Sequence, residues 1–348
     1  MSALPGVDLD ALTAWLDHAA PGLRRGPLAG ERIAGGMSNL TLRISDGATT
    51  WALRRPPLGH VLPTAHDMAR EYRILSALHG TQVPVPRPVV LCEEPEVLGA
   101  QFYLMDFVDG VVLDKPETLG LLTPDLASHA CERLIDVLLD LHAVDPTDVG
   151  LDGFGRPEGY LERQLRRWAA QWEASRTEQR PGIDDLWRRL GDRLPAQSAP
   201  GIVHGDYRLT NVIYARDVSD IVAVVDWEMT TVGDPLADVG LLVVYQDLAT
   251  QGSFLTPASS ADVGLLDSAA LVERYAAGSP RDLAPIDWYV AFGYVKLAVI
   301  AEGIHHRFLE GKTVGDGFDG VGAWVPTLLD RAADRLDRTP PTARPEEH

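Results

Sequence analysis

Cysteine is almost absent from this sequence of 348 residues, which contains only Cys92 and Cys131. Two thiols cannot form a disulfide framework or a cysteine metal site, so we expect two core thiols in a reducing compartment. The chain opens without a basic segment followed by a long apolar one, and no run approaches about 18 uninterrupted apolar residues. These absences predict a cytoplasmic protein.

Positive charge is also scarce. The chain carries 31 Lys and Arg residues against 50 Asp and Glu residues, which gives a formal net charge of −19. Nucleic acids and anionic membrane surfaces attract basic patches, so this charge argues against both as the main partner. A cationic small molecule is the easier expectation for the substrate, and we expect a monomer or homodimer. With 45% hydrophobic and 23% charged residues, the composition is ordinary for a globular protein.

Lysine is the rarer of the two strongly basic residues. Only Lys115, Lys296 and Lys312 occur, so the first 114 residues contain no lysine. A site in that part of the chain that needs a permanent cation must use arginine, which binds phosphate and carboxylate through a planar fork.

Hydrophobic periodicity divides the chain into a strand-rich first part and a helical remainder. The first part predicts a small sheet with one inserted helix over residues 64–78. Its strands are expected near residues 33, 40–44, 51–53, 89–92 and 102–105. Long helices are expected over residues 126–142 and 160–173.

This division predicts two lobes. We expect an N-terminal lobe over residues 1–106 and a C-terminal lobe over residues 107–338; the resemblance given below implies that the first binds nucleotide and that the second is the catalytic and substrate lobe. The remaining residues, 339–348, are Pro-rich and polar and are expected to be disordered.

One β-like segment, residues 201–228, interrupts the helical part. A short strand leads into His204-Gly205-Asp206, and two apolar runs joined by a turn then predict an antiparallel hairpin. Because a hairpin returns the chain to its start, Asn211 before it and Asp226 after it are expected to lie side by side. Carboxylate and amide oxygens suit Mg²⁺, and Asp206 is left to accept a proton from a hydroxyl.

The segments HGDYRLTN and VVDWE in this region resemble the catalytic and metal-binding segments of the aminoglycoside phosphotransferase family, which shares the protein-kinase-like fold. The resemblance extends over residues 28–310. It implies an α+β, bilobal protein-kinase-like fold, with a small antiparallel β-sheet N-lobe that contains one inserted helix and a larger, mainly helical C-lobe.

The resemblance also implies roles for particular residues. Asp206 is the catalytic base, and Asn211 and Asp226 hold Mg²⁺. His204 shapes the loop, and Arg208, inside the same segment, is a further candidate catalytic residue.

Three acidic residues that follow Asp226 have less certain roles. Glu228 either reaches the metal or a metal-bound water, or forms a surface salt bridge. Asp234 and Asp238 lie in a segment that also resembles the family, and we expect them to serve as a helix cap and a buried, hydrogen-bonded acid.

If the fold is kinase-like, the strand-rich part holds ATP. Gly35 and Gly36 lie between strand-like runs, where glycine lets backbone amides approach a phosphate. Ser38 and Asn39 would add side-chain donors. In the hinge between lobes, the backbone of Asp106, Phe107 and Val108 would bind adenine, by resemblance.

A kinase carries a lysine two residues after a small residue that lines the adenine pocket, since alternate strand residues share a face. Ala52 and Arg54 have that spacing, so Arg54 takes the place of the absent lysine. Arg55 is expected to face solvent or to serve as a reserve for Arg54. On the next helix, Glu71 beside the buried stripe is the expected partner of Arg54, against the alternative of a solvated charge.

These features predict an enzyme that transfers the γ-phosphoryl group of ATP to a hydroxyl of a small molecule. The alternative is a kinase-shaped nucleotide-binding or regulatory protein without transfer activity. The missing lysine weakly favours this alternative, and the presence of Asp206, Asn211 and Asp226 argues against it.

The acceptor is open between two classes of opposite charge. The run LRRPPLGHVLPTAHDMAREYRIL looks most like the branch related to the kinase-like domain fused to some acyl-CoA dehydrogenases, where hydroxyacyl-CoA is an acceptor. Another branch acts on aminoglycosides. The acceptor wall is sought among residues that could equally be core: Trp168, Trp172, Trp288, Tyr289, Glu302, His305 and His306.

Overall fold

The structure, a computed structural model, describes residues 4–33, 39–58, 67–180, 182–251, 263–313 and 318–338. The chain forms two compact units. The first comprises Met1–Val111, Val212–Asp217 and Ile221–Thr230, and the second comprises Val112–Asn211, Val218–Asp220 and Thr231–His348. The expected boundary after residue 106 had assigned the segments 212–217 and 221–230 to the second lobe, whereas they belong to the first unit.

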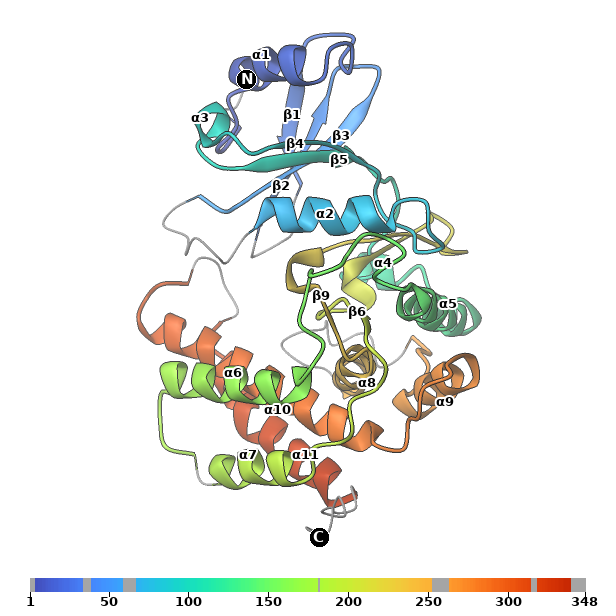
Figure 1. The fold of residues 1–348 in the computed structure, drawn as a ribbon, viewed down its shortest axis with the longest axis vertical. Helices are drawn as coiled ribbons and strands as arrows, with labels where there is room; N and C mark the ends of the chain where they lie inside the picture. The colour runs from blue at the N-terminus through green and yellow to red at the C-terminus, as the bar shows by residue number, and fades with distance from the viewer. Residues whose placement is uncertain are drawn as a thin grey trace. The chain divides into compact units, whose positions relative to one another are not determined.

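The first unit is built around a five-stranded antiparallel sheet with the order β1-β2-β3-β5-β4. Its strands are β1 (Ala29–Arg32), β2 (Leu40–Ser45), β3 (Thr50–Arg55), β4 (Pro88–Cys92) and β5 (Phe102–Asp106). Figure 1 shows α1 (Leu9–Ala19) and α3 (Pro95–Leu98) on one side of the sheet, with α2 (Met68–Leu78) on the other. The expected small sheet with one inserted helix, α2, is confirmed.

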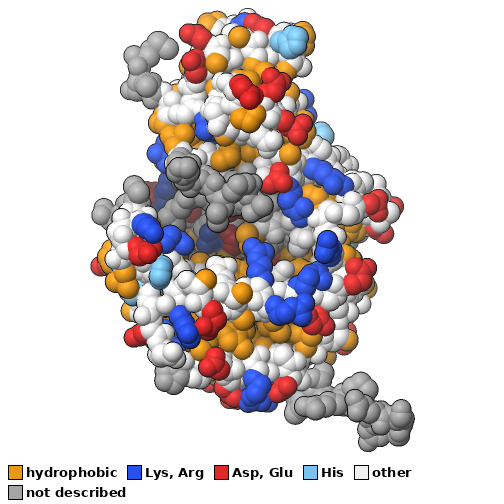
Figure 2. All heavy atoms as spheres, turned by 60° about the vertical axis from the view of Figure 1, so that its left-hand side comes forward, with side chains coloured by type: hydrophobic (Ala, Val, Ile, Leu, Met, Phe, Trp, Pro, Cys, Tyr) orange, Lys and Arg blue, Asp and Glu red, His pale blue; other side chains and the backbone are white. Residues whose placement is uncertain are grey.

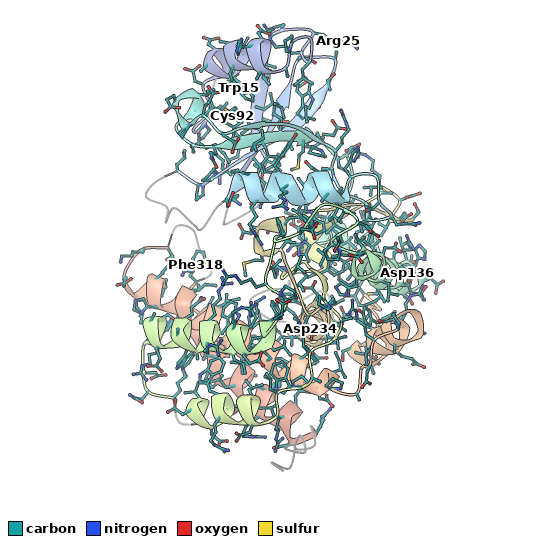
Figure 3. The ribbon with its side chains drawn as sticks, viewed as in Figure 1. Trp15, Arg25, Cys92, Asp136, Asp234 and Phe318 are labelled. Carbon is teal, nitrogen blue, oxygen red and sulfur yellow. The ribbon has the colours of Figure 1, made fainter. Side chains whose placement is uncertain are left out.

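The two faces of β3 carry different side chains, as the two-residue period of a strand requires. Trp51 and Leu53 are fully buried in a hydrophobic core that includes residues of α1. On the same side, the ring of Trp15 from α1 meets Phe102 edge-on, with 5.2 Å between ring centres (Figure 3). Arg54 has the opposite parity and points to the α2 side.

Arg55 shares the face of Trp51, and the expectation that it faces solvent is wrong. Its side chain is buried beneath α3, where Nη1 donates to the backbone oxygens of Gly6 and Leu98, the latter at 2.9 Å. Burial lowers the pKa of Arg55. Alternation correctly assigned Arg55 to the face opposite Arg54, but that face is covered rather than open.

The second unit is mainly helical. Its helices are α4 (Pro116–Leu119), α5 (Pro124–Ala143), α6 (Tyr160–Ser175), α7 (Ile183–Asp192), α8 (Leu236–Gln251), α9 (Ser268–Gly278), α10 (Ile286–Leu309) and α11 (Trp324–Arg338). Helices α8 and α10 approach so closely that a Cβ on Gly240 would lie 2.6 Å from the backbone of Tyr289. Among the described residues, no helix combines the length and apolarity needed to cross a membrane.

Two short strand pairs carry the segment between residues 201 and 233. In the second unit, β6 (Gly201–Val203) pairs antiparallel with β9 (Thr231–Gly233). In the first unit, β7 (Val212–Tyr214) and β8 (Ile221–Val224) form the expected hairpin. Asn211 belongs to the second unit and Asp226 to the first, so their expected proximity stays a prediction.

Charged side chains of both signs are interspersed on the face of the molecule drawn in Figure 2. The net charge of −19 therefore does not form one continuous acidic surface on that face. Local charge, rather than the total, must decide what binds there.

Candidate functional site

The H-G-D triplet directly follows β6 in the second unit. Gly205 has a φ of +86°, a left-handed conformation that glycine adopts without strain. The N–H groups of His204 and Gly205 donate to the carboxylate of Asp238 on α8, at 2.6 and 2.8 Å. His204 is fully buried and its ring packs edge-on against Tyr207. This part of the loop is therefore held from beneath by α8 and the core.

Asp238 is a buried carboxylate, as expected. Burial raises the pKa of Asp238, but the hydrogen bond and charge of His142 and the N–H of Gly205 outweigh it and hold the pKa below its usual value. Burial lowers the pKa of His142. A neutral His142 satisfies both contacts, because Nε2–H can donate to Asp238 at 3.4 Å while Nδ1 accepts from Tyr275 at 2.8 Å.

Asp234 acts as the expected cap. Its carboxylate accepts from the N–H of Leu236 at the start of α8, at 3.1 Å. It also accepts from Ser198, and from the hydroxyl of Tyr289 at 2.7 Å. Figure 3 shows Asp234 in the interior of the second unit, where these donors satisfy it.

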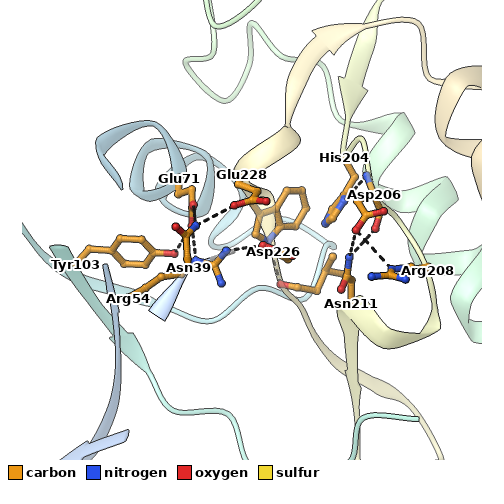
Figure 4. A network of polar contacts seen from close by, with 12 residues as sticks. Asn39, Arg54, Glu71, Tyr103, His204, Asp206, Arg208, Asn211, Asp226 and Glu228 are labelled. Atoms are coloured by element: carbon orange, nitrogen blue, oxygen red, sulfur yellow. Dashed lines mark hydrogen bonds and ion pairs between the residues drawn. The ribbon is translucent and has the colours of Figure 1, made fainter. Parts of the chain in front are cut away.

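Three side chains surround the carboxylate of Asp206, and Figure 4 shows Asn211 and Arg208 among them. The Nδ2 group of Asn211 donates to its Oδ2 at 2.8 Å and to its backbone oxygen at 2.8 Å. Arg208 places Nε 3.5 Å from the same Oδ2, and the hydroxyl of Tyr245 on α8 donates to Oδ1. Because Asn211 uses its amide nitrogen here, its amide oxygen is left for another partner.

Lys296 on α10 is a site residue that the sequence did not indicate. Its Nζ donates to the carbonyl oxygen of Gly205 at 2.6 Å and lies 5.5 Å from the ring centre of Trp168. Burial lowers the pKa of Lys296, and the nearby charge of Asp206 partly opposes this. The available signal was a lysine inside an apolar helix, since a buried charge needs a partner.

In the first unit, Arg54 lies between two carboxylates. Its Nε donates to Oε2 of Glu71 at 2.7 Å, and its Nη2 donates to Oδ1 of Asp226. The expected pair of Arg54 and Glu71 is therefore present. Burial lowers the pKa of Arg54, but the charges of Glu71 and Asp226, with Tyr103, raise it above its usual value.

Glu71 lies within the buried face of α2, rather than beside it as expected. Besides Arg54, two neutral groups donate to its carboxylate: the hydroxyl of Tyr103 at 3.0 Å and Nδ2 of Asn39 at 2.9 Å. Burial still raises the pKa of Glu71. Tyr103 was not anticipated, although the strand register that pairs it with Arg54 would have indicated it.

Asn39 joins this network instead of standing apart as a phosphate donor. Its Nδ2 also donates to Oε2 of Glu228 at 3.0 Å, so both amide protons are used within the first unit (Figure 4). The Oδ1 atom of Asn39 is buried and has no hydrogen-bond partner among the described residues. Such an atom marks a position where a donor can bind.

Asp226 has an unusual backbone. Its φ of +68° and ψ of +58° lie in the left-handed region. Among the described non-glycine residues, only Asp226 and Val218 have a positive φ. Strained backbones of this kind persist where the surroundings hold them and are concentrated at functional sites. Here the turn after β8 and the ion pair with Arg54 hold Asp226.

Part of the expected nucleotide site is described and part is not. Ala52 is buried on the Arg54 face of β3, as the alternation predicted. Gly35, Gly36 and Ser38 lie outside the described residues.

The expected hinge is more constrained than the sequence suggested. The N–H of Asp106 donates to the oxygen of Arg87 at 2.9 Å, and the N–H of Phe107 donates to Thr50 at 3.3 Å. These two amides are therefore used within the unit. The N–H of Val108 makes no backbone hydrogen bond within the described part of the chain.

The expected acceptor wall is mostly core. The four aromatic candidates are at most 3% exposed: Trp168, Trp172, Trp288 and Tyr289. Glu302 is fully buried and accepts from Thr177. The two histidines are also engaged, since His305 packs on Gly322 and His306 lies 3.6 Å from Glu310.

Two curated relatives match most of this chain. Mouse acyl-CoA dehydrogenase family member 10 is 33% identical over 329 residues, which cover 93% of this chain and 31% of that protein. Human acyl-CoA dehydrogenase family member 11 is 28% identical over 351 residues, which cover 97% of this chain and 44% of that protein. The chain thus spans less than half the length of these relatives.

Solved structures share the fold. A candidate aminoglycoside phosphotransferase from Ralstonia eutropha JMP134 is 30% identical, with a TM-score of 0.81 over 96% of this chain and 99% of that one. A thermostable mutant of another aminoglycoside phosphotransferase, bound to AMP-PNP and hygromycin B, is 16% identical with a TM-score of 0.58 over 94% and 98%. The second likeness shows the kinase-like fold alone.

The sequence profile of the phosphotransferase enzyme family matches residues 29–280, most of the chain. That range contains both the loop around Asp206 and the ion pair of Arg54. The chain therefore belongs to the phosphotransferase enzyme family and is a kinase-type enzyme with the α+β protein-kinase-like fold.

Proposed function

We propose that the protein transfers the γ-phosphoryl group of ATP, with Mg²⁺, to a hydroxyl group of a small molecule. The observation that carries the proposal is the fixed carboxylate of Asp206, which Asn211 and Tyr245 hold from both oxygens. A general base must be oriented within hydrogen-bond reach of the proton that it accepts. Phosphoryl transfer also depends more on such positioning than on covalent chemistry.

Asp206 acts on the acceptor. It accepts the hydroxyl proton while a bond forms between the acceptor oxygen and the γ-phosphorus, and the bond to the bridging oxygen of ADP breaks. His204 supports the loop from the core. Arg208 forms an ion pair with Oδ2 of Asp206, which restrains the carboxylate, and it adds a positive charge beside the transferred group.

The metal ligands would be Asn211, Asp226 and Glu228, whose amide and carboxylate oxygens are the hard donors that Mg²⁺ prefers. Within the described residues no preformed cluster of three or more His, Cys, Asp or Glu side chains exists, which fits a metal that also takes phosphate oxygens and water. The amide orientation of Asn211 leaves its oxygen for this role. Bound Mg²⁺ would supply charge neutralisation at the phosphates.

The nucleotide would bind to the first unit. Arg54 uses two of its five N–H groups on Glu71 and Asp226, which leaves donors for phosphate oxygens. Ala52 would line the adenine pocket, and the N–H of Val108 in the hinge would bind the adenine edge. The glycine loop of Gly35, Gly36 and Ser38 would cover the phosphates, next to Asn39. On this proposal the first unit, which extends to Val111, binds ATP, the second unit carries Asp206, and the enzyme is cytoplasmic.

Two acceptor classes are to be tested. The resemblance to the kinase-like domain fused to some acyl-CoA dehydrogenases is the basis for a hydroxyacyl-CoA acceptor, and the likeness to an aminoglycoside phosphotransferase structure is the basis for an aminoglycoside. Purified protein is incubated with Mg²⁺-ATP and each class, and the phosphorylated product is detected by mass spectrometry. We expect product with one class, and a loss of at least about 100-fold in rate for Asp206→Asn. Equal rates for the parent and this variant would refute the assignment of Asp206.

The second candidate is a nucleotide-binding protein without transfer activity. It is favoured by the bond from Arg54 to Asp226, which occupies an oxygen of a proposed metal ligand. This candidate predicts that ATP raises the unfolding temperature while no acceptor is phosphorylated. Mg²⁺-dependent turnover that Asp206→Asn abolishes would exclude it.

A further inference from the structure

We propose that Tyr245 is a positioning residue for Asp206 and that it determines which lone pair of the carboxylate meets the acceptor hydroxyl. This inference rests on the proposed function. Tyr245 stands on α8, outside the H-G-D segment, and nothing in the sequence pattern marks it. Its hydroxyl is the donor to Oδ1 of Asp206.

The carboxylate of Asp206 has few acceptor positions left. An ionised carboxylate offers about four lone-pair positions, two on each oxygen. Asn211 and Arg208 both approach Oδ2, and Tyr245 occupies one position on Oδ1. Among the described residues the remaining position is the second lone pair of Oδ1, so a hydroxyl that is to be deprotonated would bind next to the phenol oxygen of Tyr245.

Tyr245 is itself well fixed. It is 8% exposed, and the guanidinium of Arg208 lies over its ring, 5.0 Å from the ring centre. It follows Asp238 on α8 by about two helical turns, so both side chains project from one face of the helix. One helix therefore holds the loop at two points: Asp238 binds its backbone, and Tyr245 binds the side chain of Asp206.

The second unit contains a matched control. The hydroxyl of Tyr294 donates to the carboxylate of Asp247 at 2.8 Å, in the same unit but on a different aspartate. Tyr294→Phe removes the same kind of bond as Tyr245→Phe, and both variants keep the aromatic ring. A general effect of losing a tyrosine–aspartate bond would appear in both variants.

The kinetic test measures ADP formation from Mg²⁺-ATP, with water as the acceptor. We expect Tyr245→Phe to lower kcat by about 10- to 100-fold, as for loss of a hydrogen bond to a charged group, with the KM for ATP unchanged. Tyr294→Phe keeps the parental kcat. When Asp206→Asn is already present, adding Tyr245→Phe should not lower the residual rate further. If Tyr245 only stabilised the fold, the second substitution would still lower the rate.

A second double-mutant cycle, on the urea midpoint, measures the contact without activity. We expect coupling between Tyr245→Phe and Asp206→Asn and none between Tyr294→Phe and Asp206→Asn. An active parent with an unchanged kcat for Tyr245→Phe overturns the positioning role alone. A parent without turnover with water and with both acceptor classes overturns the proposed function and this role together, and a midpoint cycle without coupling overturns the contact itself.

Discussion

Replacement of Arg54 by methionine tests the charge network of the first unit. Methionine keeps much of the length of the side chain but removes the cation that contacts Glu71 and Asp226. When one partner of a buried ion pair is removed, the other charge stays buried without compensation. We therefore expect a large loss of stability as well as a loss of ATP binding.

The structure sets the size of this loss. Removing one partner of a buried pair costs about 3–5 kcal/mol. The side chains of Arg54 and Glu71 are 11% and 3% exposed, so water cannot replace the guanidinium at Glu71. Asp226 is 30% exposed and can be hydrated, while Tyr103 and Asn39 still donate to Glu71. We therefore expect the lower end, about 3 kcal/mol.

Urea unfolding followed by tryptophan fluorescence measures the effect. At a slope of about 2 kcal/mol/M, a loss of about 3 kcal/mol lowers the midpoint by about 1.5 M. Arg216→Met is the control, because Arg216 also donates two bonds to carboxylate oxygens. Both of these bonds go to Asp109 and both side chains are exposed, so the midpoint of this variant should not change. Adding Glu71→Gln to Arg54→Met should recover part of the loss. A midpoint for Arg54→Met equal to that of Arg216→Met would refute the reasoning.

Three further predictions concern packing, pH and thiol chemistry. Gly240→Ala should lower the free energy of unfolding by about 1–3 kcal/mol because its Cβ would overlap α10. A Cβ on Gly191 would meet nothing within 4 Å, so Gly191→Ala should leave the free energy of unfolding unchanged or raise it by up to about 1 kcal/mol. Urea unfolding of both variants tests the difference. Burial holds the pKa of His142 below its unfolded value of about 6.5, so on lowering the pH the unfolded state binds the proton first and the free energy of unfolding falls below that value. His142→Gln should therefore show a shallower fall in the free energy of unfolding between pH 7.5 and pH 5.5. Equal slopes of free energy against pH for the parent and the variant would contradict this. Burial raises the pKa of Cys131 to about 11 and also raises the pKa of Cys92. Ellman's reagent at pH 8 should therefore label neither thiol until urea unfolds the protein. Rapid labelling of the folded protein would disprove this prediction.

Local pattern was sufficient for most elements of the fold. The two-residue period placed β2, β3 and β5 and separated the core face of Trp51 from the face of Arg54. The helix expected over residues 64–78 is α2, Met68–Leu78, which Asp67 caps. The same period failed for Arg55, because alternation gives the face of a side chain but not what covers that face.

Some residues of the candidate site were likewise predictable from local pattern, and others were not. Spacing alone marked Asp206, Asn211 and Asp226, since a hairpin closes one part of the chain on another and the motif is short in sequence. The pair of Arg54 and Glu71 was also accessible, because charge balance demands a partner for a cation in a strand that faces a helix.

Distant elements supply what the sequence could not indicate. Tyr103, Tyr245 and Lys296 come from a neighbouring strand and from two helices of the second unit, and each bonds a residue far from it along the chain. Only tertiary packing brings such groups together, because the periodicity of a helix or strand fixes which side a residue faces and not which element it meets. The sequence by itself determined the family and the fold class, and it marked Asp206 as the candidate catalytic base. The tertiary structure decided which side chains hold that chemistry in place, since burial and hydrogen-bond partners exist only once the elements have packed.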